Sequence, residues 1–254
     1  PRPYILSEVN WKEVRRLNYD LAVLPWGATE AHNYHLPYGT DNYETEAFAA
    51  EAAKLAWDKG TQAIVLPTIP FGVNTGQADI PLTMSLNPST QLAILKDIVK
   101  NLKNSGIRKL LIMNGHGGNG FEPLIRELGS IYTGIFISLC NWFQAEDKAK
   151  YFDHPKGDHA DEMETSVMLH LNPELVLPLE QAGEGRAKKF KVSALNESWA
   201  WAERQWTKVT KDTGIGNPKK ADKDKGAKYF LETTRKLSRL IIELGNIKVD
   251  DLYE

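Results

Sequence analysis

Short apolar runs alternate along this chain with segments whose apolar residues recur at helical spacing. Such alternation is typical of βα units wound into a parallel sheet. We expect buried strands at residues 21–26, 63–67, 109–113 and 135–139. The pattern predicts an α/β fold in which the connections are right-handed and ligands bind beyond the carboxyl ends of the strands.

The helices expected around these strands have recognisable ends. Thr40 or Asp41 can cap a helix that ends near Asp58. A second helix is predicted over 87–106, where an asparagine cap precedes a proline and a glycine ends the apolar pattern. A last helix is expected over about 222–244.

Composition narrows the class of protein. The chain has 254 residues, 31 basic and 33 acidic, so its formal charge of −2 gives no reason to expect nucleic acid as a partner. Neither a membrane-spanning apolar run nor a signal region at the start is present, so we expect a cytoplasmic protein, taking Pro1 as near the natural start. A lone cysteine, Cys140, excludes an internal disulfide and a cysteine-based zinc cluster.

A change in residue composition along the chain bears on its domain organisation. After about residue 173 the chain becomes polar, with glycines and clustered lysines over 183–226. We expect loops and short helices there. The preferred interpretation is a single domain over 1–254 with an irregular C-terminal third.

A first cluster of polar side chains follows the first predicted strand. Residues two apart in an extended segment point the same way, so Glu30 and His32 can converge on one point. Asp41 returns to that point if Pro37 and Gly39 turn the chain. Carboxylate and imidazole groups are a typical ligand set for Zn²⁺, Mn²⁺ or Fe²⁺. The alternative is a surface loop with scattered charges and a capping Asp41, and this cluster alone leaves both open.

A glycine-rich segment with one histidine, NGHGGN at 114–119, follows the third predicted strand. Its glycines let the backbone pack closely around the His116 imidazole and leave little bulk to block a ligand. A phosphate-binding loop is the competing interpretation. The segment lacks the Lys-Ser/Thr ending of a P-loop and the spacing of a dinucleotide fingerprint, which makes that interpretation minor.

A third cluster, HADEMETS at 159–166, opens a predicted helix. Glu164 shares one face of that helix with Val167, Met168 and Leu171. Glu164 is therefore predicted to point inward, where an unpaired carboxylate costs on the order of several kcal/mol and needs a metal, a histidine or a donor. Glu162 lies about 200° around the helix, so we interpret it as an acid of the first turn that the helix dipole favours. His159 taken alone is a helix cap or a satisfied interior imidazole.

Together these segments resemble the creatininase (creatinine amidohydrolase) family. The stronger matches are 27–32, 35–41, 114–119, and 159–160 with 164–166, and the weaker ones are 81–86 and 214–218. They follow the family's order and span most of the chain. The resemblance implies a three-layer α/β/α domain with a mainly parallel central sheet, often assembled as a homo-oligomer such as a hexamer. It also implies two divalent metal ions used mostly to hydrolyse C–N bonds.

Matched position by position, the resemblance implies a role for each donor. Glu30 and His116 correspond to ligands of one metal, and His32 corresponds to a ligand of the other. Asp41 resembles the carboxylate that bridges the two metals. His159 resembles the catalytic histidine that handles protons near the scissile bond.

One position departs from creatininase itself. That enzyme has a glutamate in its Asn-Gly-His loop, completing the second metal site, where this chain and other family members have glycine, here Gly118. The departure bears on creatinine as the substrate and on the second metal. Glu164 is a candidate either to fill the gap as a metal ligand or to orient His159, and the sequence leaves both open.

The combined prediction is a divalent-metal-dependent hydrolase. It would cleave a C–N bond of a small cyclic amide or formamide by metal-bound hydroxide, with Zn²⁺ and/or Mn²⁺ or Fe²⁺ at two sites and His159 protonating the leaving group. Alternatives are a metallohydrolase of a cyclic polyol-derived ketone or a short peptide, and a non-catalytic metal-binding relative. The intact ligand set argues against the last of these.

Substrate contacts are predicted from position alone. Trp142 follows the fourth strand and is a candidate pocket wall, with an aromatic core position as an equal alternative. The loop 71–77 after the second strand is another candidate. A lid is one interpretation of three later tryptophans, but a subunit contact or satellite core is preferred for Trp199, Trp201 and Trp206. Six lysines are interpreted as a solvated face: Lys188, Lys189, Lys219, Lys220, Lys223 and Lys225.

Overall fold

The computed structural model describes residues 1–253 and contains one parallel sheet. Its strands are β1 (Leu21–Trp26), β2 (Ala63–Val65), β3 (Lys109–Asn114) and β4 (Phe136–Asn141), in the order β2-β1-β3-β4. Each predicted strand is present, with ends shifted by at most two residues.

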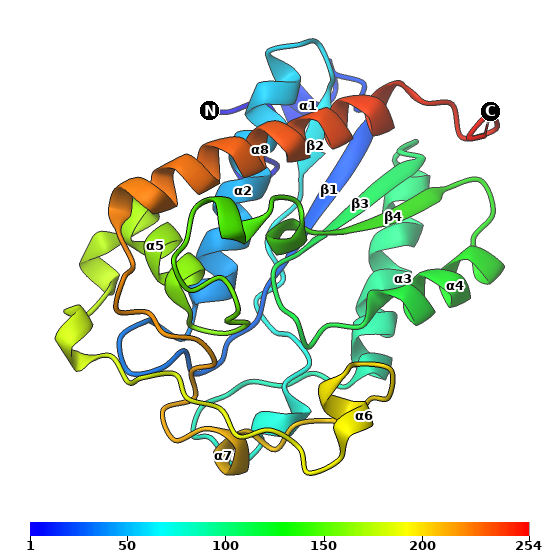
Figure 1. Cartoon of the computed structure of the whole chain (residues 1–254). Coiled ribbons are helices and arrows are strands. Elements are labelled where there is room, and N and C mark those ends of the chain that lie inside the picture. Colours follow the sequence, from blue (N-terminus) through cyan, green and yellow to red (C-terminus); the bar gives the residue numbers. More distant parts are fainter. Residues whose placement is uncertain (254) are drawn as a thin grey trace.

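Helices cover both faces of this sheet (Figure 1). One face carries α2 (Thr40–Trp57), α5 (Glu162–Leu171) and α8 (Lys223–Asn246), and the other carries α3 (Pro88–Asn104) and α4 (Phe121–Ile131). Alternate strand residues serve alternate faces, because side chains in a strand point to opposite sides in turn. The predicted α/β/α layering is therefore confirmed.

The strand alternation is visible in β1. Leu21 and Val23 pack in the core beneath α2 and α8, whereas Ala22, Leu24 and Trp26 pack beneath α3 and α4. All six residues of β1 are buried, as expected for a parallel strand covered on both faces.

A crevice opens between the carboxyl ends of β1 and β3. The chain leaves β1 toward α2 on one face and leaves β3 toward α4 on the opposite face. In doubly wound sheets such a reversal separates the two following loops and creates a binding crevice. Here those loops are 27–39 and 115–120, which hold the first two clusters predicted from sequence.

Two helix ends differ from prediction. The N-cap of α2 is Gly39, so Thr40 and Asp41 lie inside the first turn and neither caps the helix. Asn87 does precede α3, but its side chain accepts no hydrogen bond from the helix. By contrast, the Asp161 side chain caps α5 by accepting from the backbone N–H groups of Met163 and Glu164.

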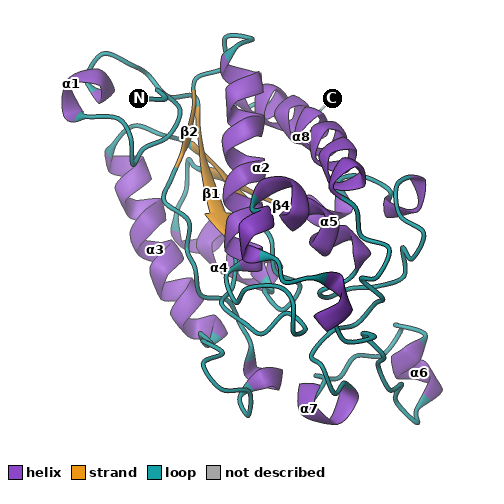
Figure 2. Cartoon of the chain, turned by 90° about the vertical axis from the view of Figure 1, so that its left-hand side faces the viewer, coloured by secondary structure: helices purple, strands orange, loops and turns teal. Residues whose placement is uncertain are grey.

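Between α5 and α8 the chain is irregular, as predicted. It contains only short elements, including α6 (Ser193–Asn196) and α7 (Trp206–Val209), which lie away from the main layers at the lower edge of the molecule (Figure 2). The remaining short elements are α1 (Trp11–Val14), η1 (Thr75–Gln77), η2 (Trp142–Gln144), η3 (Lys148–Lys150), η4 (Pro173–Leu175) and η5 (Leu179–Gln181). No helix within residues 1–253 combines the length and apolar character of a membrane span.

Candidate metal centre

The first two sequence clusters meet in the crevice between β1 and β3. Glu30 comes from the loop after β1, Asp41 from the first turn of α2 and His116 from the loop after β3. His116 Nδ1 lies 2.8 Å from Glu30 Oε1 and 3.1 Å from Asp41 Oδ2. Three donors from three elements thus form one buried group.

A second group shares Asp41. Its other oxygen, Oδ1, lies 3.0 Å from His32 Nε2, and Glu164 from α5 completes a set whose donor atoms lie within 4.8 Å of one another. Each oxygen of Asp41 therefore serves a different cluster, which is the geometry of a bridging carboxylate. All of these donors except Glu164 belong to fully buried residues, and Glu164 is only slightly exposed.

The orientation of two histidines tests whether cations fit these clusters. His116 Nε2 donates to the Val73 carbonyl at 3.0 Å, and His32 Nδ1 donates to the Glu30 carbonyl at 3.1 Å. Since a carbonyl only accepts, each ring carries its proton on that nitrogen and turns its other nitrogen toward Asp41. A lone pair that faces a carboxylate requires a proton or a cation between the two.

Unpartnered oxygens support the same fit. Glu30 Oε1 and Asp41 Oδ2 are buried, and in the described structure the only group within 3.5 Å that could donate to them is His116 Nδ1, which does so only if that ring is doubly protonated. Buried carboxylate oxygens without donors are unfavourable unless a positive charge compensates them. The carboxylates of Glu30 and Asp41 and the imidazoles of His32 and His116 therefore form a donor set suited to divalent cations such as Zn²⁺ and Mn²⁺.

Without a cation, a proton lies between each of these imidazoles and the carboxylate that it faces. Burial lowers the pKa of His32, but the facing Asp41 carboxylate outweighs burial and raises that pKa to about 10. Burial raises the pKa of Asp41, but His32 and His116 lower it well below its ordinary value. Because cations and protons compete for these atoms, any cation bound here would displace protons.

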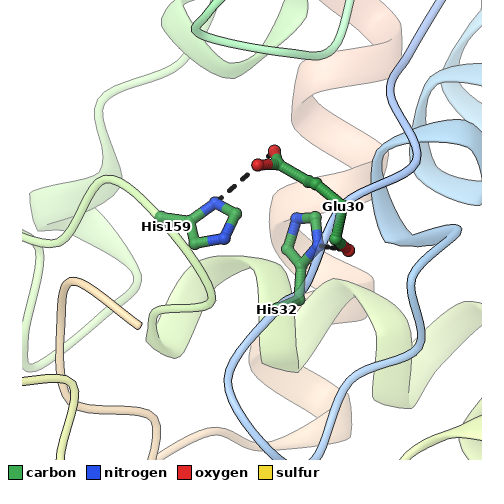
Figure 3. A group of neighbouring side chains, drawn as sticks. All are labelled: Glu30, His32 and His159. Carbon is green, nitrogen blue, oxygen red and sulfur yellow. Dashed lines mark hydrogen bonds and ion pairs between the residues drawn. The ribbon is translucent and has the colours of Figure 1, made fainter. Parts of the chain in front are cut away.

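His159 lies beside the shared site. Its Nε2 donates to the Ala31 carbonyl at 2.8 Å, and its Nδ1 is 3.8 Å from Glu30 Oε1, so the unprotonated nitrogen faces the carboxylate (Figure 3). Its ring also lies 4.2 Å from that of His32, centroid to centroid. Burial lowers the pKa of His159, which favours a neutral imidazole able to take a proton at Nδ1.

The turn between His159 and α5 is strained. Ala160 has a φ of 49°, in the left-handed region that non-glycine residues rarely adopt. Its N–H donates to Glu164 Oε2, which fixes the Glu164 carboxylate beside the cluster. Burial raises the pKa of Glu164 to about 8.

Gly118 has no side chain that could bind a second cation, and the space around it leaves no room for one. A Cβ at position 118 would lie 2.4 Å from the Val73 carbonyl oxygen and 2.5 Å from His116 Nε2. No side chain fits there while the loop keeps this conformation. A ligand from the NGHGGN loop is thus excluded at this position, and Glu164 approaches from α5 instead.

Sequence reasoning missed two groups that orient the donors. Gln77 is buried and donates to Glu30 Oε2, leaving Oε1 turned toward His116. Asn114 accepts from the His116 N–H at 3.1 Å and from the Asn119 side chain at 2.9 Å, which holds the loop in place. The NGHGGN pattern contained both asparagines, whereas nothing near Gln77 marked its contact with Glu30.

A cavity of about 350 Å³ opens over these donors. Trp142, predicted as a wall, does not line it: the ring is buried and stacked on Phe48 at 4.2 Å, and its Nε1 donates to Thr45 Oγ1. The neighbouring Phe143 lines the cavity instead. The structure thus favours the core alternative for Trp142.

Two of the three later tryptophans do reach the cavity. Trp201 and Trp206 line it, and the Trp206 ring meets the His159 ring edge-on at 4.7 Å. Trp199 is outside the lining and 75% exposed. Trp201 and Trp206 therefore line the cavity, and the preferred interpretation of these tryptophans, a subunit contact or satellite core, stays a prediction. The loop 71–77 contributes lining residues from Val73 to Gln77, as predicted.

Glu162 lies in the first turn of α5, as predicted, and points away from Glu164's cluster. It is fully buried. Its carboxylate accepts from the backbone N–H groups of Asp153 and His154 and from Lys225 Nζ at 2.7 Å. Lys225 is accordingly an ion-pair partner and not part of a solvated face.

Comparison with known proteins places this geometry in a family. The creatininase family model, described as creatinine amidohydrolase, matches residues 7–241. The chain is 31% identical over 196 residues to the creatinine amidohydrolase of Pseudomonas putida, covering 67% of this chain and 73% of that one. It is 30% identical over 189 residues to the 3-dehydro-scyllo-inosose hydrolase of Thermotoga maritima, covering 69% and 58% respectively. It is 28% identical over 162 residues to a mycofactocin precursor peptide peptidase of Mycobacterium ulcerans, covering 61% and 60%.

Solved structures agree. A Bacteroides fragilis protein provisionally described as a creatinine amidohydrolase superposes with a TM-score of 0.93 at 45% identity over the whole of both chains. A manganese form of creatininase superposes with a TM-score of 0.79 at 22% identity, over 96% of this chain and 99% of that one, which supports the fold. This chain belongs to the creatininase family, and it is a hydrolase of that family with buried clusters of metal-binding side chains.

Proposed function

We propose that this protein is a divalent-metal-dependent hydrolase that cleaves the C–N bond of a small cyclic amide or formamide. The observation that carries the proposal is the position of Asp41, whose two oxygens face two separate groups of buried donors. Without cations, these buried carboxylates are balanced only by protons on the facing His32 and His116 rings, and divalent cations would take the places of those protons.

Two ion positions follow from the donors. Glu30, Asp41 and His116 would hold one cation, and His32, Asp41 and Glu164 would hold the other. When bound, such cations supply Lewis-acid polarisation of a carbonyl and lower the pKa of water toward about 7. Gln77 keeps the Glu30 carboxylate oriented by donating to its other oxygen.

His159 is the proposed proton carrier. Its Nε2–H is committed to the Ala31 carbonyl, so the proton is taken up and released at Nδ1, which faces Glu30 and the cavity. We infer that His159 receives a proton from the attacking water and delivers it to the leaving nitrogen. The Trp206 ring packs against the His159 ring, with the two centroids 4.7 Å apart.

Amides rank first among the candidate substrates because a nitrogen leaving group needs this protonation. The relatives carry names that include a creatinine amidohydrolase, an inosose hydrolase and a peptide peptidase. A ketone or a short peptide is therefore the second class to assay.

A substrate panel with and without metal tests this proposal. The protein would be purified without chelators, stripped, and reloaded with Zn²⁺ or Mn²⁺ before assay with creatinine, N-formyl compounds, a cyclic polyol-derived ketone and a dipeptide. We expect turnover of an amide or formamide that chelation abolishes and either metal restores. Turnover that ignores chelation, or turnover of the ketone alone, would contradict the proposal.

A further inference from the structure

A second cavity of about 520 Å³ adjoins the catalytic one. It lies among the segment 187–191, α6 and α7, and Glu203 and Arg204 line both cavities. The two shared residues place this second cavity, which we call the lysine groove, directly beside the catalytic one. Its lining is Ala187, Lys188, Lys189, Phe190, Lys191, Leu195, Asn196, Glu203, Arg204, Gln205, Lys208 and Val209.

The side chains that line the lysine groove carry mostly positive charge. Glu203 is its single acidic lining residue, and that carboxylate already accepts from the Thr75 hydroxyl. Arg204 is also engaged, because its guanidinium pairs with Asp158 at 2.9 Å. Four basic residues of the groove have no carboxylate within 4.0 Å in the described structure: Lys188, Lys189, Lys191 and Lys208.

This concentration of positive charge stands in a chain whose formal net charge as a whole is −2. Ammonium groups gathered around a concave surface repel one another, and the same field attracts anions into the groove. Lysine is a flexible point charge that serves both carboxylate and phosphate groups.

Backbone contacts build the groove without using these ammonium groups. The Lys188 N–H donates to the Val209 carbonyl at 2.8 Å, which ties the segment 187–191 to α7. The Asn196 side chain accepts from the Phe190 N–H at 3.0 Å and donates to the Phe190 carbonyl at 2.8 Å, which fixes the bend before α6. The lysine side chains are thus presented by a formed surface and are not needed to hold it together.

We propose that the lysine groove binds an anionic group, a carboxylate or a phosphate, at the far end of the substrate whose amide or formamide reacts in the catalytic cavity. This inference rests on the proposed function and adds a substrate class to it. Such a molecule would pass Glu203 and Arg204, which line both cavities, with its reacting carbonyl at the buried donors and its anionic end among the lysines. A small neutral ring compound such as creatinine leaves the groove unused.

Calorimetric binding of matched probes to the metal-loaded protein tests the groove directly. The probes are acetylated tripeptide amides with three glutamates, with one phosphoserine between glycines, and with three glutamines. The groove variant is Lys189→Glu/Lys208→Glu. Its control is Lys219→Glu/Lys223→Glu, which makes the same change of charge on exposed lysines outside the groove.

At low salt we expect at least one anionic probe to bind about tenfold or more tightly than the glutamine probe, with the preference reduced by 0.2 M salt. The groove variant should lose that preference, whereas the control should stay within about twofold of the original protein. A response confined to the glutamate probe assigns the site to carboxylates, and one confined to the phosphoserine probe assigns it to phosphates.

The inference is overturned if neither anionic probe binds more tightly than the glutamine probe, or if both double variants lose affinity equally. Metal content and turnover of a neutral formamide, measured on the same proteins, separate this inference from the proposed function. The groove variant should leave both unchanged. A protein that turns over no amide but still selects anions through Lys189 and Lys208 would refute the hydrolase proposal alone.

Discussion

The two walls of the catalytic cavity are built in opposite ways. The sheet edge supplies Glu30, Asp41 and His116, which are buried and held by β1, α2 and β3. A second part of the lining comes from residues 201–206 of the irregular segment 187–209, where Trp201 is 86% exposed. The difference teaches that the groups proposed to do chemistry are fixed by the core, whereas the groups proposed to meet the rest of the substrate lie on a surface segment.

This contrast has a kinetic consequence. Changes at the sheet edge should remove metal and lower kcat, because they act on the reacting atoms. Changes in the segment 187–209 should leave the metal in place and act mainly on KM. Each prediction below tests one side of that division.

The largest effect is expected for Asp41→Ala. Because one carboxylate serves both donor groups, its loss should lower bound metal at both positions and reduce kcat/KM by at least about a thousandfold. Metal analysis and turnover on the same sample measure this. Asp97→Ala, at an exposed carboxylate on α3, is the control and should behave like the original protein. Two metals retained with full turnover would refute the bridging role.

The next effect concerns the proton carrier. His159→Ala should keep its metal but lose about a hundredfold to a thousandfold in kcat, since a positioned acid or base contributes on that order. Metal content distinguishes the roles of this residue, because His159 Nδ1 also lies within reach of Glu30 and His32. A variant that loses metal in proportion to activity would make His159 a ligand instead.

These two predictions concern residues whose place in the site could be predicted from the sequence. Short apolar runs indicated the strands, and the rule that ligands bind at the carboxyl edge of a parallel sheet brought Glu30, Asp41 and His116 together. The inward face of one helix indicated Glu164. Local patterns carry such information because each depends on residues close in the chain.

The cavity-lining residues Phe143, Trp201 and Trp206 could not be predicted in this way. Whether Trp142 or Phe143 meets the cavity depends on a one-residue difference at the end of β4 and on stacking with Phe48 from α2. Trp201 and Trp206 reach the site through contacts far apart in sequence, such as the hydrogen bond from Thr75 to Glu203. No periodicity in the sequence encodes such contacts.

A smaller effect is expected on this second wall. Trp206→Ala removes the ring that packs against His159, so kcat/KM should fall by about tenfold with metal content unchanged. Trp206→Phe, which keeps an aromatic edge, should recover most of the loss. Trp199→Ala is the matched control because that ring lies outside the cavity. Loss of metal in Trp206→Ala would break the proposed division between the walls.

The smallest effect is expected on the free energy of unfolding, through the buried residue His35. Burial, with His32 nearby, lowers the pKa of His35 to about 4, and its Nε2 lies 2.8 Å from Thr165 Oγ1. A histidine with a depressed folded pKa contributes stability above its unfolded value of about 6.5 that is lost as pH falls toward 4. By pH 4.5 the loss from this one group should be about 2–3 kcal/mol.

Urea unfolding at pH 7 and pH 4.5 measures that loss. His35→Asn should show a shallower decline between the two pH values than the original protein, whatever its offset at pH 7. Equal declines in the two proteins would show that His35 does not control the acid sensitivity of this region.

Anomalous diffraction at the zinc or manganese edge, on crystals of protein purified without chelators and supplied with that metal, tests the central claim most directly. We predict two peaks flanking Asp41, one beside Glu30 and His116 and the other beside His32 and Glu164. Crystals that show no peak at these side chains, from protein whose stability is indifferent to added cations, would contradict the account.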